Sequence, residues 1–153
     1  MDLIIIKTQE TINRVNEFLN EMMRMNEKNK IALAACSGMS PYGLVSRVTS
    51  SDLVDETKNT LSLCMGATSA DKDGFQNLIR KYPIIAISGC DGNCTLKILK
   101  QKGVKPVINI NVMDELNRKN LRPTDVSRLD DNGELCVEYM KDKIKKEIER
   151  VKK

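Results

Sequence analysis

The segment at residues 84–98, which reads IIAISGCDGNCTLKI, restricts the possible folds of this chain more than any other part of the sequence. It begins with a run of mostly β-branched apolar residues, which is typical of a strand buried on both faces. The run breaks at Ser88 and Gly89, and apolar residues then recur at helical spacing until Gly103, where a helix end is expected. The segment therefore predicts a buried strand, a tight glycine-containing turn and a helix, with Cys90 and Cys94 in the turn.

The same succession of strand and helix recurs elsewhere in the chain. Residues 31–36 form a second buried-strand pattern, and Ser40 and Pro41 then combine a favourable N-cap with proline at the first helical position. Residues 61–64 and 106–111 are two shorter strand candidates. This alternation predicts an α/β fold with a mostly parallel sheet and helices on both faces, a three-layer, Rossmann-like arrangement.

The sequence predicts further elements at both ends of the chain. Residues 3–6 are a short strand candidate, and from Thr8 apolar residues recur at helical spacing. The methionines of this helix are interpreted as core packing rather than as soft copper ligands; they are Met22, Met23 and Met25. Helices are also predicted for residues 75–82 and 114–122, ended by Pro83 and Pro123, and for a last apolar stripe from Val137 to Val151 that follows a turn at 130–133.

The length favours one domain over residues 1–153: an N-terminal strand and helix at 1–30, a cysteine-bearing core at 31–111 and C-terminal helices at 112–153. The short apolar run near the start has the length of neither a signal peptide nor a transmembrane span, so a cytoplasmic location is expected. Thiols stay reduced in the cytoplasm, so the five cysteines are expected to be metal ligands or reactive groups rather than disulfides.

The composition excludes several kinds of chemistry. The chain contains no histidine, which excludes Ser-His and Cys-His nucleophiles and mixed Cys/His zinc sites. The net charge of +4 is concentrated in residues 141–153, which we interpret as a solvated helix face. Few aromatic residues accompany these charges, so neither a nucleic acid nor a membrane is expected as a partner; a protein or small-molecule partner is left open.

Three of the cysteines share a local pattern in which glycine stands two residues after the thiol. The three are Cys36, Cys64 and Cys90, and Cys94 adds a fourth thiol in the first turn of a predicted helix. Glycine lets the backbone turn so that its N–H groups can point at the sulfur. In a parallel sheet, ligands bind at the carboxyl ends of the strands, where Cys36 and Cys90 are expected. Four thiols without histidine fit a zinc site or, alternatively, an iron-sulfur cluster.

The alternative without any chemical role is that some of these cysteines are buried free thiols, since unpaired cysteine is among the most buried residue types. That interpretation is favoured for Cys136, which lies beside Val137 in the predicted last helix. It is less suited to cysteines in glycine-containing turns at the ends of strands.

The order of these motifs resembles the DGC family, whose members are proposed to bind zinc. The resemblance covers residues 31–110: Cys36-Ser37-Gly38 with the later Gly43, the segment at 61–66, and GCDGNC leading into LKILKQKG. It implies that the zinc ligands are Cys36, Cys64, Cys90 and Cys94. The chain departs from the family at Ser88, which stands where the aspartate of the name motif is expected, while an Asp-Gly pair follows Cys90 instead.

Two classes of function remain open at this point. If all four thiolates bind zinc, the site has no open position for a substrate, and the role is structural, regulatory or metal-carrying. If only three bind, a water or substrate thiol takes the fourth position and Asp91 becomes a candidate acid or base. The alternative is redox or sulfur-transfer chemistry, with Cys94 as the thiolate at the helix N-terminus and Cys90 or Cys36 as its resolving partner.

Overall fold

The computed structural model describes residues 2–36 and 38–153, which group into two compact units, Met1–Lys30 and Ile31–Lys153. The first unit is one long helix, α1 (Asp2–Lys28). The strand predicted at residues 3–6 is therefore wrong. A short apolar run has no periodicity that separates a strand from a helix, and this one continues into the helical pattern that follows.

The second unit is an α/β domain, as predicted, built on a four-stranded parallel sheet with the order β2-β1-β3-β4. Its strands are β1 (Ile31–Ala35), β2 (Thr60–Leu63), β3 (Ile84–Ser88) and β4 (Ile108–Asn111). Its helices are α2 (Pro41–Glu56), α3 (Met65–Ser69), α4 (Asp73–Lys81), α5 (Cys94–Gln101), α6 (Val112–Asn117) and α7 (Asp131–Val151). That residues 1–153 form a single domain stays a prediction.

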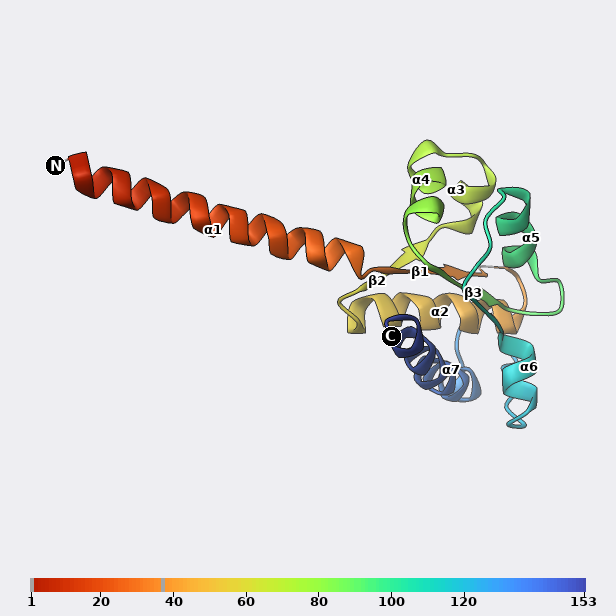
Figure 1. Cartoon of the computed structure of the whole chain (residues 1–153). Helices are drawn as coiled ribbons and strands as arrows, with labels where there is room; N and C mark the ends of the chain where they lie inside the picture. Colours follow the sequence, from red (N-terminus) through yellow and green to blue (C-terminus); the bar gives the residue numbers. More distant parts are fainter. Residues whose placement is uncertain (1, 37) are drawn as a thin grey trace. The chain divides into compact units, whose positions relative to one another are not determined.

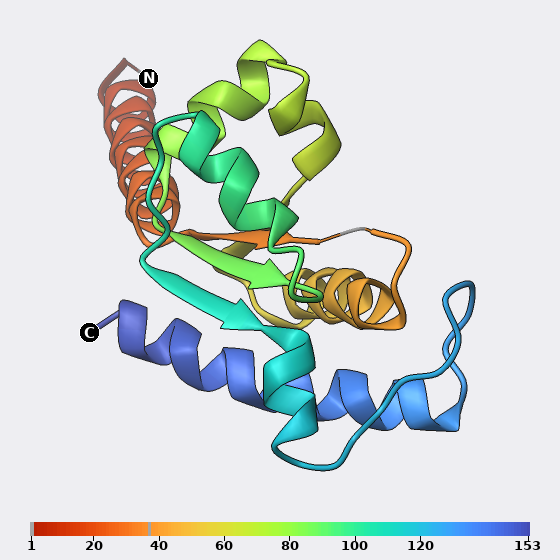
Figure 2. The same ribbon diagram turned by 90° about the vertical axis from the view of Figure 1, so that its right-hand side faces the viewer.

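The helices cover both faces of the sheet. Figures 1 and 2 show α3, α4 and α5 on one face and α2, α6 and α7 on the other, which is the three-layer arrangement predicted. The central strands β1 and β3 are buried along their whole length, and their side chains alternate between two apolar clusters. Ile85 and Ile87 face α2 and α7, whereas Ile84 and Ala86 face α4 and α5. This alternation fixes which face of the sheet each residue at the strand ends occupies.

Some predicted element boundaries are confirmed and others are shifted. Ser40 caps α2 as expected, since its hydroxyl accepts a hydrogen bond from the N–H of Gly43 at 3.0 Å. Gly103 follows α5 with φ +68°, the left-handed conformation expected at a helix end. The turn predicted at residues 130–133 is instead the start of α7, because the Asp130 carboxylate accepts from the N–H of Gly133 at 2.7 Å. Helix α6 begins and ends earlier than the predicted 114–122.

The basic stretch at residues 141–153 is not a uniformly solvated face. The Lys141 side chain is only 9% exposed, and its Nζ lies 2.5 Å from Glu56 and 2.9 Å from Glu138. The hydrogen bond with Glu56 is the main cause that raises the pKa of Lys141 and that lowers the pKa of Glu56. The stretch therefore also connects α7 to α2, the two helices that pack side by side on one face of the sheet. Within the part of the chain that the structure describes, no helix is long and apolar enough to cross a membrane.

Candidate functional site

Three neighbouring strands are each followed by a cysteine at the same edge of the sheet. Cys64 directly follows β2, Cys36 directly follows β1, and Cys90 comes two residues after β3. The strands are parallel and neighbours in the order β2-β1-β3, so all three cysteines lie at the carboxyl edge, as predicted for Cys36 and Cys90. Adjacent strands are about 4.8 Å apart, so the three loops that carry these thiols are close neighbours.

Glycines allow two of these loops to approach the start of α2. A Cβ atom placed on Gly89 would lie 2.7 Å from the Cα and the N of Gly43. A Cβ atom placed on Gly43 would lie 2.8 Å from the carbonyl oxygen of Gly38. Both distances are shorter than real contacts of a Cβ atom, so no side chain fits between these backbones. The three glycines therefore hold the loops after β1 and β3 against each other through the first turn of α2.

Cys36 is the most buried of the four candidate ligands, with 9% of its surface exposed. Its backbone N–H donates to the carbonyl of Ile87 at 2.8 Å, which extends the pairing of β1 and β3 beyond the last strand residue. The N–H of Gly38 lies 3.4 Å from the Cys36 Sγ and donates to it. The predicted approach of a glycine N–H to the sulfur is thus confirmed at this cysteine. Ser37, between the two, lies outside the described residues.

The loop at Cys90 is fixed by an asparagine at the end of β4. The Asn111 Nδ2 donates to the Cys90 carbonyl at 3.1 Å, and the Asn111 Oδ1 accepts from the N–H of Asp114 as the cap of α6. The N–H of Met113 also donates to the Gly89 carbonyl at 3.1 Å. Asn111 was not among the residues predicted from the sequence, although its position at the end of a predicted strand was a usable signal.

Cys90 and Cys94 face the same point of their loop. A Cβ atom placed on Gly92 would lie 3.6 Å from the Cys90 Sγ and 3.7 Å from the Cys94 Sγ. Asn93 precedes α5 in the left-handed conformation, with φ 49°, and its N–H donates to the Cys90 carbonyl at 3.2 Å. This tight turn brings Cys94, the exposed first residue of α5, back toward the partly buried Cys90.

Cys64 has a different setting from the other members of the Cys-x-Gly pattern. It is exposed and occupies the N-cap position of α3, where its carbonyl accepts from both the N–H and the hydroxyl of Thr68 at 2.9 Å. Gly66 lies inside α3, and apart from its chain neighbours and the backbone of its own helix, a Cβ atom placed there would have no described atom within 4 Å. The glycine after Cys64 therefore packs against nothing that the structure describes.

The four thiols share one edge of the sheet without forming a closed cluster. In residues 2–36 and 38–153 no three side chains of the Cys, Asp, Glu or His type are close enough together to hold a metal ion. All five cysteines are free thiols. Cys136 is fully buried among the core residues of α7, which agrees with its interpretation as packing, and burial raises its pKa.

Two buried hydroxyls beside the cysteines have no hydrogen-bond partner among the described residues: those of Ser88 and Thr95. Ser88 is 0% and Thr95 1% exposed. Ser88 follows Ala86 on the face of β3 that α5 covers, and Thr95 lies one turn before Leu99, which packs on that face. Leaving a buried hydroxyl unpaired costs about 1–3 kcal/mol. Such hydroxyls in the segment that carries Cys90 and Cys94 are suited to donate to a sulfur or to a bound ligand.

The fold and the site together define a class, namely parallel α/β proteins with a set of thiols at the carboxyl edge of the sheet. A family model, the DGC domain, matches residues 32–138, and the chain belongs to the DGC domain family. The match confirms the resemblance stated from the sequence. No curated protein and no solved structure matches the chain.

Proposed function

We propose that this protein binds one zinc ion through Cys36, Cys64, Cys90 and Cys94. One observation carries the proposal: three neighbouring parallel strands are each followed by a cysteine at one edge, and the fourth cysteine begins α5 beside them. Membership of the DGC domain family is consistent with metal binding. Thiolates without histidine are a donor set that zinc accepts in sites with four protein ligands.

The surroundings of the sulfurs also suit a bound metal. The N–H of Gly38 already donates to the Cys36 Sγ, and hydrogen bonds of this kind stabilise the negative charge of a coordinated thiolate. The unpaired hydroxyls of Ser88 and Thr95 are further donors at the same edge. Bound zinc would supply a positive charge that keeps the four thiols ionised, and this chain's own residues would orient them.

Zinc is expected to stabilise the fold, because the thiols lie on loops that the metal would draw together. A ligand that binds only the folded state, at a free concentration of a hundred times its dissociation constant, raises the free energy of unfolding by about 2.7 kcal/mol. Cys64 and Cys94 are the exposed members of the set, so their loops are expected to change most on binding. A closed site of four thiolates has no open position, so this proposal assigns no catalytic step.

The test is elemental analysis with a visible spectrum on the full chain, purified without chelator. We expect about one colourless zinc ion per chain, lost in Cys94→Ser and retained in Cys136→Ala. Cys136 is the matched control, since it is the one cysteine that lies in the α7 core rather than at the sheet edge. A metal-free protein would contradict the proposal, and brown protein with iron and sulfide would replace zinc by an iron-sulfur cluster.

A second candidate function, thiol-disulfide exchange, is favoured by the position of Gly92 between the sulfurs of Cys90 and Cys94. In this reaction the exposed Cys94 thiolate attacks a disulfide substrate, and one substrate thiolate leaves as a mixed disulfide forms. Cys90 then displaces the second thiol, so the substrate gains two electrons and two protons and the protein keeps a Cys90–Cys94 disulfide. Selective, fast alkylation of Cys94 in metal-free protein would support this function, and equally slow labelling of all thiols would contradict it.

A further inference from the structure

Helix α1 presents an apolar stripe to solvent. Seven large apolar side chains between residues 12 and 25 are 47–62% exposed, namely Ile12, Val15, Phe18, Leu19, Met22, Met23 and Met25. Within this unit, which is a single helix, the three methionines have no other element to pack against, and their interpretation as core packing stays a prediction. Monomeric proteins rarely expose an apolar stripe of this length, and such a surface commonly marks an interface.

The stripe has the spacing of a coiled coil. Ile12, Val15, Leu19 and Met22 succeed one another at intervals of three, four and three residues, which places them at consecutive a and d positions of a heptad repeat. Ile5, seven residues before Ile12, continues the a position toward the N-terminus. A helix of 27 residues is about 40 Å long, so α1 spans almost four heptads.

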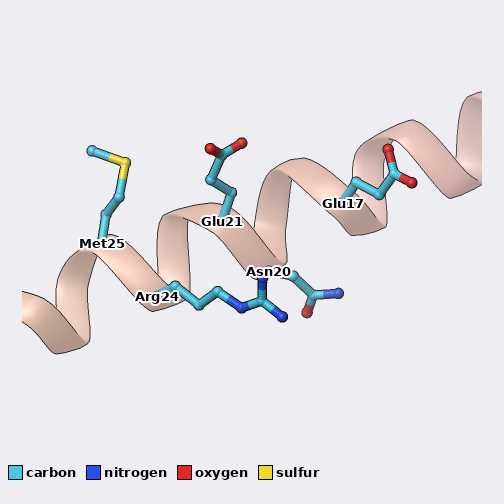
Figure 3. A pocket seen from close by; sticks show the side chains of 5 residues that line it. All are labelled: Glu17, Asn20, Glu21, Arg24 and Met25. Carbon is cyan, nitrogen blue, oxygen red and sulfur yellow. The ribbon is translucent and has the colours of Figure 1, made fainter.

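The charged residues of α1 lie away from the a and d positions, which would form the seam of a coiled coil. Between residues 11 and 25, the a, d, e and g positions contain only uncharged residues, which are Thr11, Ile12, Val15, Asn16, Phe18, Leu19, Met22, Met23 and Met25. The charged residues of the same stretch, Arg14, Glu17, Glu21 and Arg24, occupy only the c and f positions. Figure 3 shows part of this charged side, with Met25 near its boundary.

We propose that α1 pairs with α1 of a second copy of this chain in a two-stranded coiled coil. The heptad spacing makes the stripe complementary to itself, because knobs at a and d fit the holes of an identical helix. The uncharged e and g positions bring no like charges together across the pair, and Phe18 and Met25 at g widen the buried surface.

The experiment is the mass of the full chain in solution by sedimentation equilibrium, between about 5 and 200 µM. Reductant and chelator are present, so that neither a disulfide nor a bridging metal joins two chains. We expect twice the chain mass of 17.2 kDa. Leu19→Asp, which places an unpaired charge in the seam of each helix, is expected to raise the dissociation constant of the dimer at least about a hundredfold.

Asn20→Asp is the matched control, because it adds the same charge at the neighbouring residue, in the b position away from the seam. We expect this variant to remain a dimer, and circular dichroism of all three proteins to show that the α/β domain stays folded. A wild-type monomer over the whole range, or a Leu19→Asp dimer of unchanged affinity, would overturn the proposal. Wild-type monomers that float with vesicles of anionic lipid would overturn it in favour of a membrane surface.

Discussion

The loops after Cys36 and Cys90 contain the same Cys-x-Gly pattern as the loop after Cys64, but the loops are packed differently. Around the first two cysteines, the pattern's own glycines, Gly38 and Gly92, lie beside cysteine sulfurs, and Gly43 and Gly89, outside the pattern, meet backbone atoms at distances that leave no space for a Cβ atom. After Cys64, Gly66 lies in a short helix with no described atom near its missing side chain. A short motif repeated in sequence therefore need not be repeated in structure. The candidate site has one tightly packed half and one open half.

Gly89→Ala is expected to have the largest effect, because the added methyl would meet Gly43 backbone atoms at 2.7 Å. Neither backbone can shift without moving β3 or the start of α2, so we expect a loss of about 1–3 kcal/mol of unfolding free energy, as for overpacking in general. Urea denaturation followed by circular dichroism measures it. An unfolding midpoint equal to that of the wild type would show that the two loops are not held together by this contact.

Asn111→Asp tests the second element that holds the packed half. The substitution keeps an oxygen that can cap α6 but replaces the Nδ2 donor that reaches the Cys90 carbonyl, so two acceptors would then face each other. We expect a loss of about 1–2 kcal/mol, together with faster alkylation of Cys90 by iodoacetamide. Asn109→Asp is the control, since it makes the same change at an exposed position of the same strand. If both variants lose the same stability, the hydrogen bond from Asn111 to the Cys90 carbonyl does not contribute to stability.

Thr95→Val tests whether the buried hydroxyl next to Cys94 affects stability and metal affinity in opposite directions. Its hydroxyl has no partner among the described residues, so an apolar side chain of the same shape should stabilise the metal-free protein by up to about 1 kcal/mol. If the hydroxyl donates to a coordinated sulfur, zinc affinity should fall about tenfold at the same time. Competition with a chromophoric chelator measures the affinity.

Thr49→Val is the matched control for the opposite effects of Thr95→Val on stability and on zinc affinity. The Thr49 hydroxyl is also buried and unpaired within the described part of the chain, but it lies on α2 rather than beside α5. It should show the gain in stability without the loss of zinc affinity. A Thr95→Val protein with unchanged zinc affinity would remove this hydroxyl from the site while leaving zinc binding by the cysteines untouched.

The sequence was sufficient to predict the strands and helix ends that have a local pattern of residues. Strands β1 and β3 are buried on both faces, so their continuous apolar runs were unambiguous, and Ser40 and Gly103 marked helix ends through their own chemistry. The run at residues 3–6 was misassigned because four apolar residues have no period of their own. Local signals thus identified the longer elements, whereas the five-residue helix α3 was not predicted.

The site was predictable only as a set of residues at one edge. The alternation of strands and helices placed Cys36 and Cys90 there, since parallel strands share a carboxyl edge. The sequence could not show that Gly89 packs on Gly43, or that Asn111 reaches the Cys90 loop, because these contacts join segments distant along the chain. Nor could it distinguish Gly66 from the other glycines of the pattern, because that difference depends on what packs nearby.

Gly66→Ala is expected to have the smallest effect and the opposite sign. Gly66 has the backbone of a helix and open space at its Cβ position among the described residues, so alanine should stabilise α3 by about 0.5–1 kcal/mol. Gly74→Ala makes the same change near the start of α4, where the described surroundings are equally open, and should gain a similar amount. If Gly66→Ala lost stability while Gly74→Ala gained it, the loop after Cys64 would be packed like the other two. The division of the site into a rigid and an open half would then be wrong. If both gain and zinc still binds to Gly66→Ala, the glycine after Cys64 serves neither packing nor the metal, and the motif is functional at that loop only through its thiol.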